Sequence, residues 1–172
     1  MELKQAISLC QNGHKEAFSE IVTKFYGQAV RFASKFTKNS PDAEDIVQDT
    51  FVQVWKNLKS LEKQDAFKSW FFTILNNLCK KKWKPEYSSP LPDELPSKSA
   101  QTELEEIDNK RMIEEYLMQL TPIQRKVLML REMEDLSYSE IGKILDIAEG
   151  TVKSRIASAR EKMRTLMSEG GK

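Results

Sequence analysis

The sequence predicts an all-α protein of two small helical domains joined by a flexible linker, the second domain containing a helix-turn-helix. Three observations support this fold class. The composition, with 31% charged residues, 40% hydrophobic residues and only 6 Gly, is typical of a soluble helical protein. Apolar residues recur at helical spacing along both halves of the chain. Between the halves lies a segment rich in proline and acidic residues, which cannot continue a helix.

The net charge of +1 conceals an uneven distribution. Lys+Arg and Asp+Glu number 14 and 9 in residues 1–84, 1 and 7 in 85–109, and 12 and 10 in 110–172. No apolar run approaches the roughly 20 residues that span a bilayer, and the N-terminus lacks a signal-peptide layout. We therefore expect a cytoplasmic protein without membrane insertion. Cys10 and Cys79 are isolated from each other and from a ligand cluster, so we expect free thiols, no metal and no cofactor.

The first 84 residues predict successive helices rather than strands. After an apolar helical pattern from Phe18 to Phe36, a helix is expected to begin with Ser40 as its N-cap and Pro41 at its first position. Its buried stripe would be Ile46, Thr50, Phe51, Val54, Trp55 and Leu58. The opposite face carries Asp42, Asp45, Gln48, Asp49 and Val52. Taken alone, this acidic face favours a solvated surface near a helix N-terminus over a binding or metal site.

The stretch from Ala66 to Lys84 predicts a helix with an aromatic stripe and a basic end. Its expected core residues are Phe67, Trp70, Phe71, Ile74, Leu75 and Leu78. Around Trp83 stand Lys80, Lys81, Lys82 and Lys84. Proteins bind single-stranded DNA with such combinations of aromatic and basic residues, because bases stack on aromatic rings while cations follow the phosphates. The alternative, a core helix whose terminal lysines complement its dipole, explains the aromatic residues equally well.

Residues 85–105 are predicted to form the linker. Four of the six prolines lie in the acidic stretch "KPEYSSPLPDELPSKSAQTELEE", and proline is excluded from helix interiors. The predicted domains are therefore residues 1–84 and residues 106–172.

The second domain predicts a helix-turn-helix. One helix ends before "LTP", where Thr121 caps the next helix and Pro122 takes its first position. Ser137 and Glu140 form a capping box at the start of a short helix. Only "DIA" separates that helix from "EGTVKSRIASAREKMR", which leaves a turn of about three or four residues. Gly142 suits this arrangement, because the two helices must cross closely.

The last helix has three distinct faces. Its buried stripe would be Val152, Ile156, Ala159, Met163 and Leu166. Its outer face carries Ser154, Ala157, Ser158 and Glu161, between the basic shoulders Lys153, Arg160 and Arg164 on one side and Arg155 and Lys162 on the other. Short side chains let a backbone approach base edges while flanking cations reach phosphates, which suits the major groove. A basic amphipathic surface helix is the alternative, but the preceding turn favours DNA.

The stretch "LTPIQRKVLMLREMEDLSYSEIGKILDIAEGTVKSRIASAREKMRTLM" resembles region 4 of bacterial sigma factors of the sigma-70 family, in particular the extracytoplasmic-function (ECF) group. Asp146 stands where the family turn usually has Gly, and Ala148 where Ser usually caps the recognition helix. Asp tolerates the left-handed conformation, so the turn should persist. Glu149 in the first turn partly offsets the missing cap.

The resemblance implies that the last helix reads the −35 promoter element. The residues implied for base edges are Glu149, Thr151, Ser154 and Ser158, and those implied for phosphates are Lys153, Arg155 and Arg160.

The first domain resembles sigma region 2. "DAEDIVQDTFVQVWKNL" is similar to region 2.2, whose exposed face docks on the clamp helices of the polymerase β′ subunit. The resemblance implies docking through Asp42, Asp45, Gln48, Asp49 and Val52. "SWFFTILNN" and the basic end resemble regions 2.3 and 2.4, which capture the opened −10 strand. The residues implied there are Trp70, Asn76, Asn77, Lys80, Lys81 and Lys84; Lys81 replaces a frequent Asp, a departure that bears on base preference.

The order of these segments is that of a minimal sigma factor and covers nearly the whole chain. It implies a transcription initiation factor, not an enzyme, whose partners are core RNA polymerase (β′ clamp helices and β flap), promoter DNA and an anti-sigma factor. The first alternative is a stand-alone helix-turn-helix regulator, which would need a sensory or dimerising domain. A hydrolase or nuclease would need convergent acids or a catalytic histidine, and only His14 is present. A helical scaffold would show no preference for promoter DNA.

Overall fold

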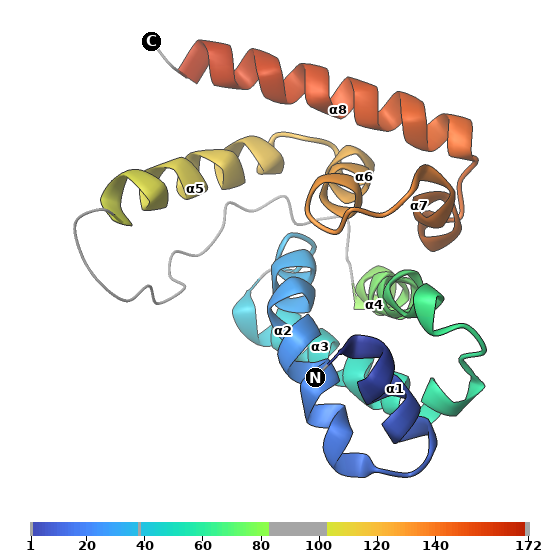
Figure 1. Ribbon diagram of the computed structural model, residues 1–172. Helices are drawn as coiled ribbons and strands as arrows, with labels where there is room; N and C mark the ends of the chain where they lie inside the picture. The colour runs from blue at the N-terminus through green and yellow to red at the C-terminus, as the bar shows by residue number, and fades with distance from the viewer. Residues whose placement is uncertain (1, 38, 83–102, 171–172) are drawn as a thin grey trace. The chain divides into compact units, whose positions relative to one another are not determined.

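The computed structural model describes residues 2–37, 39–82 and 103–170, except for the side chains of residues 103–108 and 170. Within these residues all regular structure is helical, with eight α-helices, three short 3-10 turns and no strand. The chain divides into two compact units, built mainly from α1 to α4 and from α5 to α8 (Figure 1). The prediction of an all-α fold with two helical domains is confirmed. No helix in the described ranges is long and apolar enough to cross a bilayer.

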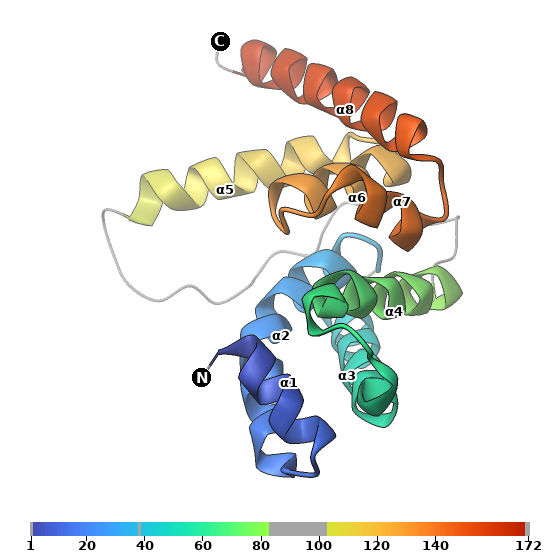
Figure 2. The same cartoon turned by 45° about the vertical axis from the view of Figure 1, so that its right-hand side comes forward.

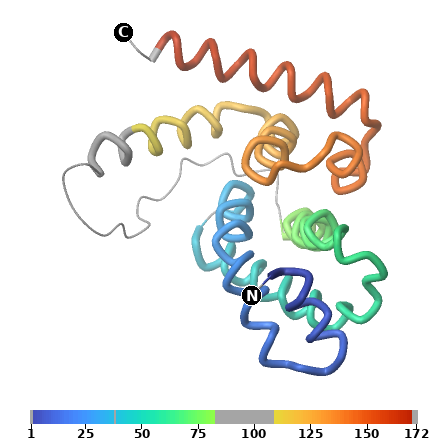
Figure 3. Tube along the Cα trace, viewed as in Figure 1, coloured from blue at the N-terminus to red at the C-terminus, as the bar shows by residue number. Residues whose placement is uncertain are grey.

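The first unit is organised around phenylalanine rings. Its helices are α1 (Leu3–Gln11), α2 (Phe18–Ser34), α3 (Ser40–Asn57) and α4 (Phe67–Lys82), and their course is followed most easily in the Cα trace (Figure 3). The Phe25 ring on α2 lies 5.2 Å from Phe67 and 5.0 Å from Phe71 of α4, and Phe51 of α3 lies 5.4 Å from Phe71. Such aromatic contacts add to the burial of large apolar side chains. This core fixes α3 beside α4.

Two details of α3 differ from the sequence prediction. The N-cap is Asn39, not Ser40: its side chain accepts a hydrogen bond of 2.9 Å from the Asp42 backbone N–H. Both residues are good caps, and the helix starts one residue earlier than expected. Trp55, predicted to be buried, is 38% exposed and packs edge-on against Phe18 with 5.0 Å between ring centroids. The indole therefore covers the rim of the core.

The second unit packs its long last helix on α6. The helices are α5 (Glu103–Met118), α6 (Pro122–Glu132), α7 (Tyr138–Leu145) and α8 (Glu149–Gly170). A cluster of Leu117, Leu120, Leu128 and Ala159, with Met163 beside it, joins α5, α6 and α8. The predicted apolar stripe of α8 is buried at Val152, Ile156 and Ala159 and half-buried at Met163 and Leu166. α5 begins at Glu103, inside the predicted linker 85–105; residues 85–102 lie outside the described residues.

The turn between α7 and α8 consists of residues 146–148 (Figure 2). Asp146 takes the left-handed conformation with φ of 57°, as expected for a position where Gly is usual. The Ile147 N–H donates to the Gly142 carbonyl at 3.0 Å. A Cβ on Gly142 would lie 2.8 Å from the Ile147 carbonyl oxygen, which explains why the crossing needs glycine. The predicted cap at Thr121 and the capping box of Ser137 with Glu140 are both present.

Candidate nucleic-acid interface

The outer face of α8 presents the side chains that the sequence assigned to DNA. Lys153, Ser154, Arg155 and Ser158 are exposed, as are Glu149 and Arg160, and Thr151 is half-buried. The opposite stripe is anchored in the core by Val152, with 0% exposure. Because packing holds the helix on one side only, its small polar side chains are left in the open. Short polar side chains flanked by cations have the chemistry that a major groove accepts.

Two serines of this face are held by different hydrogen bonds. The Ser154 hydroxyl donates to the Thr151 carbonyl within α8 at 3.0 Å. The Ser158 hydroxyl is contacted from α6, where the Gln124 side-chain amide donates to it at 2.8 Å. Gln124 could not be predicted from the sequence, because its contact joins residues 34 positions apart and leaves no periodic signal.

The basic shoulders of α8 are not equivalent. Arg160 is paired with Glu132 of α6: its Nε donates to a carboxylate oxygen at 2.9 Å, and this hydrogen bond raises the pKa of Arg160. No partner of this kind is recorded among the described residues for Lys153 or Arg155. Both cations are available to a phosphate, whereas Arg160 would first have to leave Glu132.

The end of α4 carries part of the predicted strand-binding set. Asn77, Lys80 and Lys81 are exposed, and Trp70 is half-buried. Asn76 has 0% exposure, so its side chain is not on the surface in this structure. Trp83 and Lys84, also named from the sequence, lie outside the described residues.

The predicted acidic face of α3 is on the surface. Asp45, Gln48 and Asp49 are exposed, Asp42 is half-buried, and the apolar Val52 is 50% exposed. We call these five residues the docking face. Its acids meet the basic end of α4 at Lys82, whose Nζ lies 3.8 Å from Asp45 and 4.0 Å from Asp49. Exposed pairs of this kind contribute little to stability, so they leave the carboxylates available.

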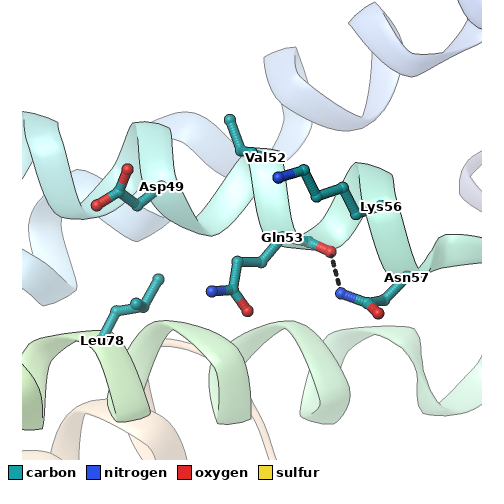
Figure 4. A pocket seen from close by; sticks show the side chains of 6 residues that line it. All are labelled: Asp49, Val52, Gln53, Lys56, Asn57 and Leu78. Carbon is teal, nitrogen blue, oxygen red and sulfur yellow. Dashed lines mark hydrogen bonds between the residues drawn. The ribbon is translucent and has the colours of Figure 1, made fainter.

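A shallow hollow adjoins the docking face between α3 and α4 (Figure 4). It is lined by Asp49, Val52, Gln53, Lys56, Asn57 and Leu78. The Asn57 amide donates to the Gln53 carbonyl at 2.8 Å along one wall. Leu78 comes from α4, so the hollow extends the docking face onto a second helix. Leu78 was predicted to lie in the core, and its helical spacing gives no sign of this surface.

No group of three or more His, Cys, Asp or Glu side chains within the described residues is placed to hold a metal ion. Cys10 and Cys79 are buried free thiols, and burial raises the pKa of Cys10.

The sequence matches two protein-family models, which follow each other along the chain in the same order as the two units. "Sigma-70 region 2" matches residues 21–86, and "Sigma-70, region 4" matches residues 110–163. The chain belongs to the sigma-70 family. Region 2 thus covers α2 to α4, and region 4 includes the helix-turn-helix of α7 and α8.

Relatives place this sigma-70 protein in the ECF group. It is 30% identical to "ECF RNA polymerase sigma factor SigW" of Bacillus subtilis, over 95% of this chain and 96% of that protein. It is 31% identical to "ECF RNA polymerase sigma-E factor" of Escherichia coli K12, over 88% of this chain and 86% of that protein. As a sigma factor it is a transcription initiation factor that directs RNA polymerase to promoters, and a stand-alone regulator is not favoured.

Two solved structures are similar to this sigma factor along most of its length. CnrH, in complex with the cytosolic domain of CnrY, has a TM-score of 0.71 and 23% identity, with 97% of each chain covered. The sigma factor RpoE of Bartonella quintana, in complex with the anti-sigma factor NepR, has a TM-score of 0.66 and 25% identity, with 88% of this chain and 96% of that chain covered. The similarity to CnrH supports the fold of this chain.

Proposed function

We propose that this sigma factor binds core RNA polymerase through the docking face of α3 and reads the −35 element with the outer face of α8. In the same proposal, the end of α4 holds the opened −10 strand. The protein acts in the cytoplasm. The domains doing this work are residues 1–84 and 106–172, joined by residues 85–105. The observation that carries the proposal is the outer face of α8, where exposed Ser154 and Ser158 lie between Lys153 and Arg155, two exposed cations without an ion pair to any residue that the structure describes.

The chemistry of α8 divides its side chains into two roles. Hydroxyls are short groups that can donate to or accept from base edges, whereas Lys and Arg reach phosphates and carry no sequence information. Glu149, Thr151, Ser154 and Ser158 are therefore assigned to bases. Lys153 and Arg155 are assigned to phosphates, and Arg160 joins them only after it separates from Glu132.

The docking face has the composition of a protein interface that binds a basic partner. The exposed Asp45 and Asp49 share this face with the exposed Val52, so charge can steer the encounter and apolar contact can retain it. We assign this face to the clamp helices of β′. The second unit is assigned to the β flap, and an anti-sigma factor is proposed as a further partner because RpoE is solved with one.

Co-elution with core RNA polymerase on a size-exclusion column tests the docking face. Wild type is compared with Asp49→Lys, which reverses the charge at its centre, and with Glu44→Lys as the matched control. Glu44 is an exposed acid of the same helix outside the docking face. We expect wild type and Glu44→Lys to co-elute with polymerase and Asp49→Lys to elute alone.

Two outcomes would contradict the proposal. Equal retention of both variants would remove the docking face from the interface. Failure of the folded wild type to bind polymerase, together with specific DNA binding by the free protein, would instead identify a stand-alone helix-turn-helix regulator.

A further inference from the structure

Four side chains form a straight stripe along α3. Asp45, Asp49, Val52 and Lys56 follow one another at intervals of four, three and four residues, which places them on one side of a helix over about three turns. All four are exposed. Along the helix the order is therefore two acids, one apolar side chain and one base.

The hollow between α3 and α4 lies beside the second half of this stripe (Figure 4). Asp49 and Lys56 stand at its opposite ends, with Val52 and Gln53 between them on α3. Leu78 of α4, which is half-buried, supplies a second apolar surface across the hollow. The volume of the hollow is about 470 Å³, a size that admits a whole side chain of a partner.

The two ends of the hollow differ in charge. At one end Asp49 and the neighbouring Asp45 outnumber Lys82, whose Nζ lies 4.0 and 3.8 Å from them, so this end stays acidic. At the other end Lys56 is exposed and has no ion pair with any residue that the structure describes. A uniformly basic partner would be attracted to the first end and repelled by the second.

The helix dipole explains only part of this order. It favours acids in the first turn of a helix and bases in the last, and its effect fades beyond those turns. Lys56 lies in the last turn of α3, where it also stabilises the helix. Asp45 and Asp49 lie beyond the first turn, so the dipole accounts neither for them nor for the exposed Val52.

We propose that the hollow receives an apolar side chain of a β′ clamp helix, which places a basic residue against Asp49 and an acidic residue against Lys56. The inference rests on the proposed docking of α3, and it adds an apolar anchor, a contribution from α4 and a direction. Continuity selects this partner, because Asp49 and Val52 belong to the docking face and also line the hollow. Since the two ends differ in charge, the partner helix fits along α3 in one direction only.

Lys56→Glu separates this inference from a simple attraction between an acidic face and a basic partner. The substitution makes the face more acidic, so a uniformly basic partner would bind more tightly. A partner with an acid opposite Lys56 should instead bind about 2- to 10-fold more weakly, because an attraction becomes a repulsion. Affinity is measured by titrating core RNA polymerase into the fluorescently labelled full chain. Lys59→Glu makes the same charge change at an exposed lysine outside the hollow and should not weaken binding.

Gln53→Trp tests whether the hollow is occupied in the complex. Gln53 is exposed, so an indole can fill the hollow without entering the core. Binding to core polymerase should then weaken by about 10-fold or more, because the anchoring side chain loses its place. Gln5→Trp makes the same exchange at an exposed glutamine of α1 and should bind as wild type does. Circular dichroism verifies that each variant is folded at the temperature of the titration.

The possible failures are distinguishable. If Asp49→Lys abolishes binding but Lys56→Glu binds as tightly as wild type or more tightly, or Gln53→Trp binds as wild type does, the inference is overturned and the proposed function stands. If Asp49→Lys binds as wild type does, the docking face fails and the inference fails with it. If Gln53→Trp keeps its affinity for polymerase but loses a self-association of the free chain seen by light scattering, a second copy occupies the hollow and the inference is likewise overturned.

Discussion

The guanidinium of Arg125 caps the C-terminal end of α5. Its Nε donates to the Leu117 carbonyl at 2.9 Å, and one terminal nitrogen donates to the carbonyls of Met118 and Leu120 at 3.2 and 3.1 Å. The last carbonyls of a helix have no partner within that helix. Arg125 is itself 7% exposed, and burial lowers its pKa, although an arginine stays protonated at neutral pH. One side chain thus joins α6 to the end of α5.

Replacing Arg125 by Met should therefore destabilise the second unit by about 2–4 kcal/mol, because buried carbonyls lose their donors. Hydrogen exchange of peptides from α6 and α8 measures the loss within the full chain. Arg111→Met is the matched control, since Arg111 is an exposed arginine of α5, and it should change exchange little. Equal protection in the two variants would contradict a capping role for Arg125.

At the scale of helices, an element end can be predicted from the sequence where a local rule decides it. The ends of α6 and α7 follow from Thr121 with Pro122 and from Ser137 with Glu140, because caps act within one turn. The start of α3 was misplaced by one residue, because Asn39 and Ser40 are both good caps and only the fold chooses between them. The fold class was accessible for the same reason, since apolar periodicity is local.

The turn between α7 and α8 gives a test at this scale. Gly142→Ala would bring a Cβ to 2.8 Å from the Ile147 carbonyl oxygen, so the backbone of the turn before α8 must shift. We expect a stability loss of about 1–3 kcal/mol and weaker promoter binding, measured by urea unfolding and by DNA binding of holoenzyme.

Gly150→Ala is the control for that substitution. A Cβ there meets nothing within 4 Å, and alanine is the better helix former by roughly 0.5–1 kcal/mol. Stability should therefore be unchanged or higher. A similar loss in both variants would mean that glycine is not needed for the close crossing at Gly142.

At the scale of the whole molecule, the candidate surfaces were predicted more completely than the contacts beneath them. The docking face and the outer face of α8 follow from which side of each helix is apolar. The pairing of Arg160 with Glu132, the contact of Gln124 with Ser158 and the burial of Asn76 depend on how separate helices pack. Sequence periodicity carries no information about such contacts, so they required the structure.

The net charge of +1 shows that affinity for DNA must come from local cations, and Arg155 tests this. A phosphate contact releases counterions, so its loss should weaken binding to every promoter and reduce the slope of log K against log salt by about 1. We expect this for Arg155→Ala when holoenzyme binds promoter fragments over a range of salt. Lys110→Ala, an exposed cation of α5, should leave the slope unchanged.

Ser154→Ala provides the opposite signature in the same assay. It removes a group assigned to a base edge, so the preference at one promoter position should relax while the salt slope stays constant. If Arg155→Ala instead altered sequence preference without changing the slope, Arg155 would be a base reader. The roles proposed for the two faces of α8 would then be exchanged. The basic shoulder, and not the serine face, would lie deepest in the groove and contact the bases.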